Sequence, residues 1–188
     1  ISNDENINKA ILENYKNRKQ GKAVQLGALI DFKEFNSFQA FVSDNELQEL
    51  IKRIGYPPIR LTDLAIDIHL VNKDNKDEIV HIPNSIYFPK IGNSPVVTNP
   101  SEIKLKNPKN YFQISIDENK ANSKFVANYL NSTIGKKLRE SIEVGAVIRQ
   151  IPKYQLSQCV LCLPDIKTQF ELISIDSKID QFTFRLEE

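Results

Sequence analysis

The spacing of the apolar residues changes at Asp117, and this change limits what the chain can fold into. Before Asp117, apolar and polar residues alternate in short runs at 65–71, 78–82, 85–88 and 111–116, as expected of half-buried strands. After it, apolar residues recur every three or four positions, a spacing typical of helices. The chain is therefore predicted to adopt an α+β fold, as a strand-rich globular module with several helices.

Turn and cap residues predict where the elements begin and end. Polar residues at 72–77 separate two alternating runs and predict a β-hairpin tip. Ser43, followed by Glu46, predicts the start of a helix that Gly55 ends. Ser123 is expected to cap a second helix, and residues 136–143 to form a third, basic one. We expect further strands at 23–32 and 159–163, turns at 62–64 and 153–157, and a Gly-containing loop at 145–152.

The two ends of the chain differ from its middle. Residues 1–22 are polar apart from a few apolar side chains at helical spacing, and they predict a linker or entry helix. Residues 165–188 predict a C-terminal spacer helix of the coiled-coil type, because apolar residues follow a heptad spacing. Its seam consists of Leu172, Ile175, Ile179, Phe182 and Leu186. Packing of this short seam on the chain's own domain is the alternative.

Composition narrows the classes of protein further. A chain of 188 residues, 40% of them hydrophobic, is long enough for one domain with its own core. It has no run of about 18 apolar residues and no signal-peptide pattern, so no membrane contact is expected. Two cysteines make no disulfide framework, and a cytoplasmic location is expected. Because the chain starts with Ile1, we expect a processed chain or a fragment of a longer one.

Charge is unevenly distributed along the chain. The net charge of only +1 argues weakly against a pure nucleic-acid binder. Residues 90–153, however, carry eleven basic and five acidic side chains, whereas residues 31–84 carry six basic and ten acidic ones. Such asymmetry can concentrate a positive field on one face of a nearly neutral protein.

Motifs for catalysis or metal binding are weak. The candidates are Cys159 and Cys162, His69 and His81, and Asp63 and Asp67. The cysteines have no second pair, and positions three apart in a strand face opposite sides. The histidines have no nucleophile motif beside them, and no phosphate-binding glycine loop occurs. We therefore expect a module without catalytic residues or a metal site, in which these side chains are structural.

Basic and amide side chains in loops are the remaining candidates for function. Arg, Asn and Gln can form paired hydrogen bonds with base edges, whereas Lys suits phosphates. The candidate DNA-binding residues are Arg60, Lys90, Asn93, Ser94, Lys136, Lys137, Arg149, Gln150 and Lys153. A basic face that is only solvated is the alternative.

Five short motifs in a fixed order resemble those of a known family. They are the segments 24–30 (VQLGALI), 56–64 (YPPIRLTDL), 85–97 with its Gly-Asn pair, 129–136 (YLNSTIGK) and 161–164 (LCLP), followed by Gln169. In this order the chain resembles the target recognition domain of type I restriction–modification specificity subunits. The same domain is found fused to some adenine-specific DNA methyltransferases.

The resemblance implies a function in sequence-specific DNA recognition. Residues 23–164 would read one half of a double-stranded DNA target, and residues 165–188 would begin the conserved spacer helix. That helix would contact an adenine-specific methyltransferase subunit or fused domain and a second recognition half. Methylation or cleavage would be carried out there, with S-adenosylmethionine in the methyltransferase and no cofactor in this domain. The competing interpretation is a protein–protein interaction domain with no direct DNA contact.

Overall fold

The computed structural model describes residues 2–23, 37–71, 79–103, 110–145 and 147–187. The chain divides into two compact units, Ile1–Asn36 and Ser37–Glu188, which are described separately here. In the first unit, helix α1 (Ser2–Lys19) confirms the predicted N-terminal helix. Its apolar residues Ile7, Ile11, Leu12 and Tyr15 are exposed. The strand predicted at 23–32 lies almost wholly outside the described residues.

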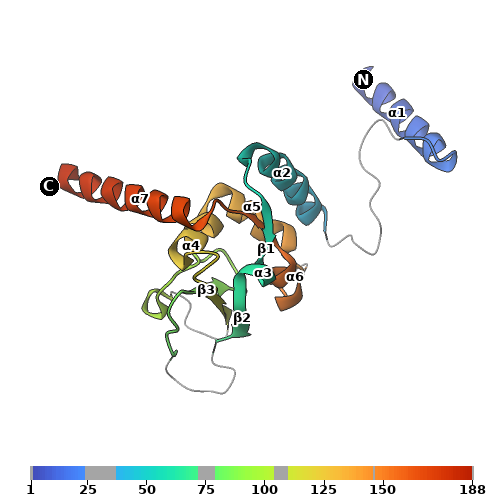
Figure 1. The fold of residues 1–188 in the computed structure, drawn as a ribbon. Coiled ribbons are helices and arrows are strands. Elements are labelled where there is room, and N and C mark those ends of the chain that lie inside the picture. Colours follow the sequence, from blue (N-terminus) through green and yellow to red (C-terminus); the bar gives the residue numbers. More distant parts are fainter. Residues whose placement is uncertain (1, 24–36, 72–78, 104–109, 146, 188) are drawn as a thin grey trace. The chain divides into compact units, whose positions relative to one another are not determined.

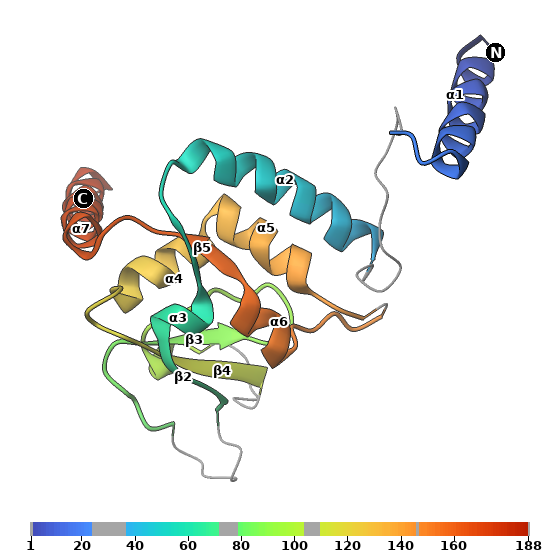
Figure 2. The ribbon, with the colours of Figure 1, turned by 45° about the vertical axis from the view of Figure 1, so that its right-hand side comes forward.

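In the second unit, helix α2 (Phe38–Ile54) begins earlier than the sequence predicts. The Ser37 hydroxyl caps it by accepting a hydrogen bond from the Ala40 N–H at 3.0 Å. The predicted start at Ser43 is therefore wrong: Ser43 is buried inside the helix, and its hydroxyl donates to Glu140 at 3.0 Å. Gly55 ends the helix with a φ of 72°, as predicted. Helix α2 lies along α5 (Thr133–Ile142) in Figure 2.

The larger sheet contains β2 (Ala65–Leu70) and β3 (Ser85–Pro89), both labelled in Figure 1, and β4 (Tyr111–Ile116), labelled in Figure 2. Its antiparallel order is β2-β4-β3. The three strands confirm the predicted runs at 65–71, 85–88 and 111–116. The hairpin pairing of 65–71 with 78–82 is wrong, because β2 pairs with β4 and the described residues 79–82 form no strand. The predicted hairpin tip lies outside the described residues.

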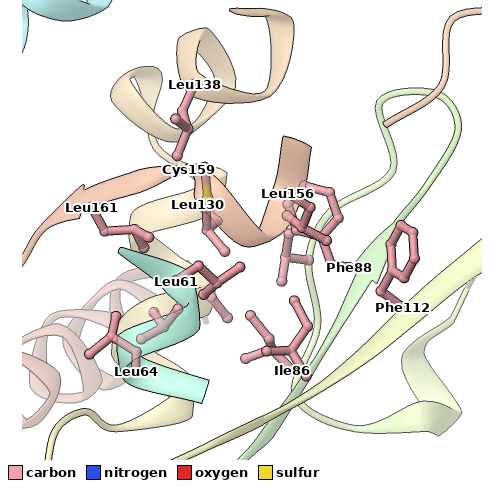
Figure 3. Packing of buried hydrophobic residues seen from close by; sticks show 14 of the residues in the cluster. Leu61, Leu64, Ile86, Phe88, Phe112, Leu130, Leu138, Leu156, Cys159 and Leu161 are labelled. Carbon is pink, nitrogen blue, oxygen red and sulfur yellow. The ribbon is translucent and has the colours of Figure 1, made fainter. Parts of the chain in front are cut away.

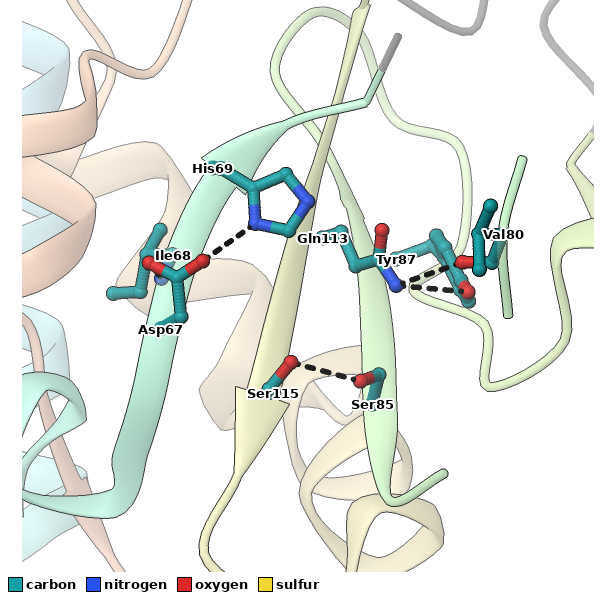
Figure 4. Close-up of polar contacts among 8 residues, drawn as sticks. All are labelled: Asp67, Ile68, His69, Val80, Ser85, Tyr87, Gln113 and Ser115. Carbon is teal, nitrogen blue, oxygen red and sulfur yellow. Dashed lines mark hydrogen bonds and ion pairs between the residues drawn. The ribbon is translucent and has the colours of Figure 1, made fainter. Parts of the chain in front are cut away.

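The central strand β4 is buried along its whole length, and so is β3. The polar residues of β4 form hydrogen bonds with neighbouring residues (Figure 4). Ser115 accepts a hydrogen bond from the Ser85 hydroxyl at 3.2 Å. The Gln113 amide donates to the Val80 carbonyl at 3.1 Å and to the Tyr87 hydroxyl at 3.3 Å. Alternating apolar and polar residues predict a strand with one solvent-exposed face, but β4 is buried on both faces because its polar side chains are hydrogen-bonded.

A second, two-stranded sheet joins β1 (Pro58–Arg60) to β5 (Val160–Cys162). The turns predicted at 62–64 and 153–157 form short helices instead. They are α3 (Leu61–Leu64), after β1, and α6 (Lys153–Gln158), before β5. A 3₁₀ turn, η1, spans Pro100–Glu102.

The main core lies between the larger sheet and the helices α3, α4 (Ser123–Asn131), α5 and α6. Figure 3 shows Leu61, Leu130 and Leu156 of these helices in one cluster with Ile86, Phe88 and Phe112 of the sheet. Helix α5 begins close against α4, where a Cβ on Gly135 would meet the Tyr129 carbonyl. Glycine is therefore required at this approach. The cap of α4 is Asn122, one residue before the predicted Ser123.

Helix α7 (Ile166–Glu187) confirms a C-terminal helix. Asp165 caps it by accepting the Thr168 N–H at 3.0 Å. The buried Gln169 ties the helix to the domain, since it donates to the Pro164 carbonyl at 2.8 Å and accepts from the Asn122 N–H at 3.0 Å. The seam residues Leu172, Ile175, Ile179 and Phe182 are partly exposed. Among the described residues, no helix has both the length and the apolar character needed to cross a bilayer.

Candidate nucleic-acid interface

Two loops that lie about sixty residues apart in sequence meet at one edge of the domain. One follows β3, and the other connects α5 to α6. Ile91 and Gln150 form an antiparallel bridge, and the Ile151 N–H donates to the Lys90 carbonyl at 2.8 Å. We call residues 90–95, 144–145 and 147–153 the two-loop surface.

The second loop is closed at its base. Val144 and Gln150 exchange two backbone hydrogen bonds of 2.9 Å each. Gly145 has a φ of 113°, and a Cβ there would meet the Ile148 carbonyl, so this turn requires glycine. The chain is thereby folded back on itself, which places Val147 and Ile148 at the exposed tip.

Arg139 of α5 holds the first loop. Its guanidinium donates to the Ser94 carbonyl at 3.1 Å and to the Gly92 carbonyl at 3.0 Å. The side chain is only 6% exposed and lies over the Phe88 ring, 5.3 Å from its centre. Burial lowers the pKa of Arg139, but a guanidinium stays charged. Arg139 is not among the site residues predicted from the sequence, and its role here is to position the loop.

The described residues form three hollows along the two-loop surface. The first, of about 490 Å³, has Asn93, Lys136 and Arg139 in its wall. The second, of about 410 Å³, has Asn93 and Arg149. The third, of about 340 Å³, has Lys90, Gln150 and Lys153. Asn93 thus borders two of them, and side chains from both loops and from α5 face a common region.

Acidic groups lie in the same region. Glu140 and Glu143 of the α5 end line the first two hollows. Burial raises the pKa of Glu143, an effect that the positive charges of Arg149 and Arg139 oppose. The surface is therefore mixed in charge rather than uniformly basic, and the negative charge of Glu143 partly offsets the positive charge of Arg149.

The structure brings most of the predicted DNA-binding residues together. The two-loop surface contains Lys90, Asn93, Ser94, Arg149, Gln150 and Lys153, and Lys136 borders its first hollow. Arg60 is not part of it, because it lies on β1 opposite Val160 of β5. The Lys137 ammonium is engaged with Glu46 of α2 at 2.7 Å and with Glu140 at 3.2 Å. The Glu46 hydrogen bond is the main cause of the raised pKa of Lys137.

His69 lies beside the two-loop surface, although the sequence predicts a structural role for it. Its Nδ1 lies 2.8 Å from the Asp67 carboxylate, two positions earlier on the same face of β2 (Figure 4). The hydrogen bond from His69 is the main cause of the lowered pKa of Asp67. His69 lines the third hollow beside Lys90, Gln150 and Lys153. No spacing signal could have found it, because only the β2–β4 pairing places it there.

The other candidates Cys159, Cys162 and His81 line none of these three hollows. Cys159 and Cys162 are both buried, and burial raises the pKa of the Cys159 thiol to about 12. A thiol in that state stays protonated and is a poor ligand or nucleophile at neutral pH. His81 is within 3.3 Å of the Tyr87 hydroxyl. In the part of the chain that the structure describes, no three His, Cys, Asp or Glu residues could hold a metal ion together.

Comparison with known proteins adds nothing to this geometry. No protein family model matches the chain, and no curated protein sequence matches it significantly.

Proposed function

We propose that this chain is the DNA-recognition module of a restriction–modification system. It would direct adenine methylation or cleavage that a partner subunit or fused domain carries out. The observation that supports this most is the meeting of the two loops: backbone hydrogen bonds join the segments that bear Lys90 and Gln150. Residues proposed independently from two regions of sequence thereby share one surface, as a binding site requires.

Each residue of the surface has a proposed role. Arg149, Gln150 and Asn93 are exposed, and their side chains suit base edges. Lys90, Lys136 and Lys153 would meet phosphates, with His69 beside two of them. Arg139 and Ser94 fix the first loop rather than contact DNA. Lys137 is engaged in ion pairs, and Arg60 lies on another element, so neither is included in the revised contact set.

The other parts of the chain fit the same proposal. Residues 23–164 would be the target recognition domain, and α7 the start of the spacer helix, with its apolar seam partly exposed. The seam would pair with the helix of a second recognition half or of the methyltransferase. S-adenosylmethionine would bind in that partner, and the module itself would need no cofactor. Such a system works in the cytoplasm, where its DNA substrate is.

A protein–protein interaction domain is the second candidate function. The partly exposed seam of α7 and the acidic residues Glu140 and Glu143 favour it. Carboxylates beside Lys136 and Arg149 reduce the positive potential that would attract phosphates. This candidate predicts no measurable affinity for DNA.

A salt titration of binding to mixed-sequence duplex DNA tests the proposal. The logarithm of the binding constant should fall linearly with the logarithm of salt concentration, because each phosphate contact releases a counterion. Lys136→Ala should reduce that slope by about one contact, and Arg149→Ala should weaken binding or relax sequence preference. Lys178→Ala, which removes one exposed charge from α7, is the matched control. If the folded chain fails to bind duplex DNA at low salt, the proposed function is wrong.

A further inference from the structure

The tip of the second loop exposes two neighbouring β-branched residues. Val147 is 94% exposed and Ile148 is 68% exposed, so neither contributes to the core. Single exposed apolar side chains are common on proteins, but adjacent ones at a turn gain nothing from folding. Their position inside the proposed recognition surface suggests a contact with a ligand.

Backbone hydrogen bonds fix the base of the loop that carries this tip. The two Val144–Gln150 hydrogen bonds close it, and the bridge from Gln150 to Ile91 fixes it against the first loop. The next residue, Ile151, is 1% exposed and anchors the loop in the core. A rigid support reduces the entropy that binding must overcome, which is what an apolar contact of small area needs.

Two polar hydrogen-bonding residues follow the tip in sequence: Arg149 lines the same hollow as Val147 and Ile148, whereas Gln150 lines the third hollow. Arg149 follows Ile148, and Gln150 follows Arg149. Arginine and glutamine read guanine and adenine edges in the major groove of DNA. The same groove displays the C5 methyl group of thymine, whose recognition requires an apolar side chain. The order of residues therefore combines, on one short segment, side chains that suit both kinds of base edge.

We propose that Val147 and Ile148 contact thymine methyl groups in the major groove and so contribute to base specificity. This inference rests on the proposed function, since it deepens the role of the same surface. A protein partner would also accept an apolar tip, because the hollow that the tip lines holds Glu140 and Glu143 beside Arg149. The further cations Lys90 and Lys153 of the two-loop surface, which line the third hollow, favour a polyanion.

Uracil-containing DNA provides a direct test, because uracil differs from thymine only by the missing methyl group. Duplexes selected for binding from a random library would be made again with deoxyuridine at each thymidine in turn. At the contacted positions the intact chain should bind about fourfold more weakly for each methyl lost. The double variant Val147→Ser, Ile148→Ser, which leaves no methyl group at either side chain, should bind both duplexes equally and about as weakly as the intact chain binds uracil DNA.

Both substituted residues are exposed and make no part of the core, so the variant should fold. Val80→Ser, at a side chain 73% exposed outside the two-loop surface, is the matched control and should keep the preference for thymine. If the intact chain binds thymine and uracil duplexes equally, the inference is wrong while the proposed function stands. The same holds if the double variant keeps the preference. Failure to select any DNA would instead overturn the proposed function.

Discussion

The side-chain amide of Asn131 pairs with both backbone groups of Val96. The Val96 N–H donates to Asn131 Oδ1 at 2.8 Å, and Asn131 Nδ2 donates to the Val96 carbonyl at 2.8 Å. The next residue, Val97, pairs with Tyr87 of β3 through backbone hydrogen bonds of 2.7 and 3.2 Å. The far end of the first loop is thus held from both sides, by α4 and by the larger sheet.

Replacement of Asn131 should therefore destabilise the domain. Asn131→Ala leaves the N–H and the carbonyl of the buried Val96 without partners, at an expected cost of about 2–4 kcal/mol in the free energy of unfolding. Urea denaturation measures this cost. Asn93→Ala is the control, because Asn93 is exposed on the same loop and should affect DNA binding but not stability. Equal stability of Asn131→Ala and the intact chain would show that Val96 finds other partners.

Arg139 should act on DNA binding through the shape of the first loop. Arg139→Lys keeps the positive charge but cannot bond the Gly92 and Ser94 carbonyls together. We expect a loss of about 1–3 kcal/mol in the free energy of unfolding and weaker DNA binding with an unchanged salt slope. Denaturation and a salt titration separate the two effects. A variant with full stability and a reduced salt slope would make Arg139 a direct phosphate contact instead.

The adjacent residues Lys136 and Lys137 should behave differently. Lys136 is exposed at the first hollow, whereas the Lys137 ammonium is engaged with Glu46 and Glu140. Lys136→Ala should lower the salt slope of DNA binding by about one, and Lys137→Ala should leave it unchanged. Titrations of the two single variants under identical conditions provide the measurement. A lower slope for Lys137→Ala would show that DNA competes with Glu46 for that ammonium.

The state of Cys159 predicts how stability depends on pH. Its pKa is about 12 in the folded chain against an ordinary value of 9.0, so the unfolded chain loses the thiol proton first. Stability from this group is complete below pH 9 and falls as the pH rises towards 12. Between pH 8 and pH 10 the loss should be on the order of 1 kcal/mol.

Urea denaturation at these two pH values, with a reducing agent present, measures the loss. Other groups also titrate in this range, so the relevant quantity is the difference between the intact chain and Cys159→Ala. That difference should shrink by the stated amount as the pH rises. If it stays constant, the Cys159 thiol titrates normally and is more accessible than the structure shows.

The sequence predicts the elements of this fold better than their arrangement. Helices α5 and α7 and the strands β2, β3 and β4 follow from the spacing of apolar residues alone. The start of α2 does not, because Ser43 satisfies a capping pattern while the structure uses it for a buried hydrogen bond to Glu140. Local cap signals compete with tertiary contacts that a single sequence does not show.

The candidate site shows the same division. The sequence predicts each of the two loops, the one bearing Lys90 and the one bearing Arg149, on the basis of its own glycine and basic residues. Their meeting depends on the Ile91–Gln150 bridge, a pairing across about sixty residues that no periodicity encodes. His69 reaches the surface only because β2 pairs with β4 rather than with the next run of the sequence. Composition therefore indicates the kind of site, whereas long-range pairing decides its members.

The apolar seam of α7 predicts self-association of the chain. Ile175 is 50% exposed and Phe182 is 63% exposed. Both lie on a helix whose first turn is tied to the domain by the hydrogen bond from Gln169. Pairing two such helices would bury both seams, as in a coiled coil. Sedimentation equilibrium should show a monomer–dimer equilibrium, and Ile175→Ser with Phe182→Ser should shift it to monomer. Glu171→Ala, at an exposed position outside the seam, should leave the equilibrium unchanged. If the intact chain stays monomeric at high concentration, the seam is not an interface between two copies.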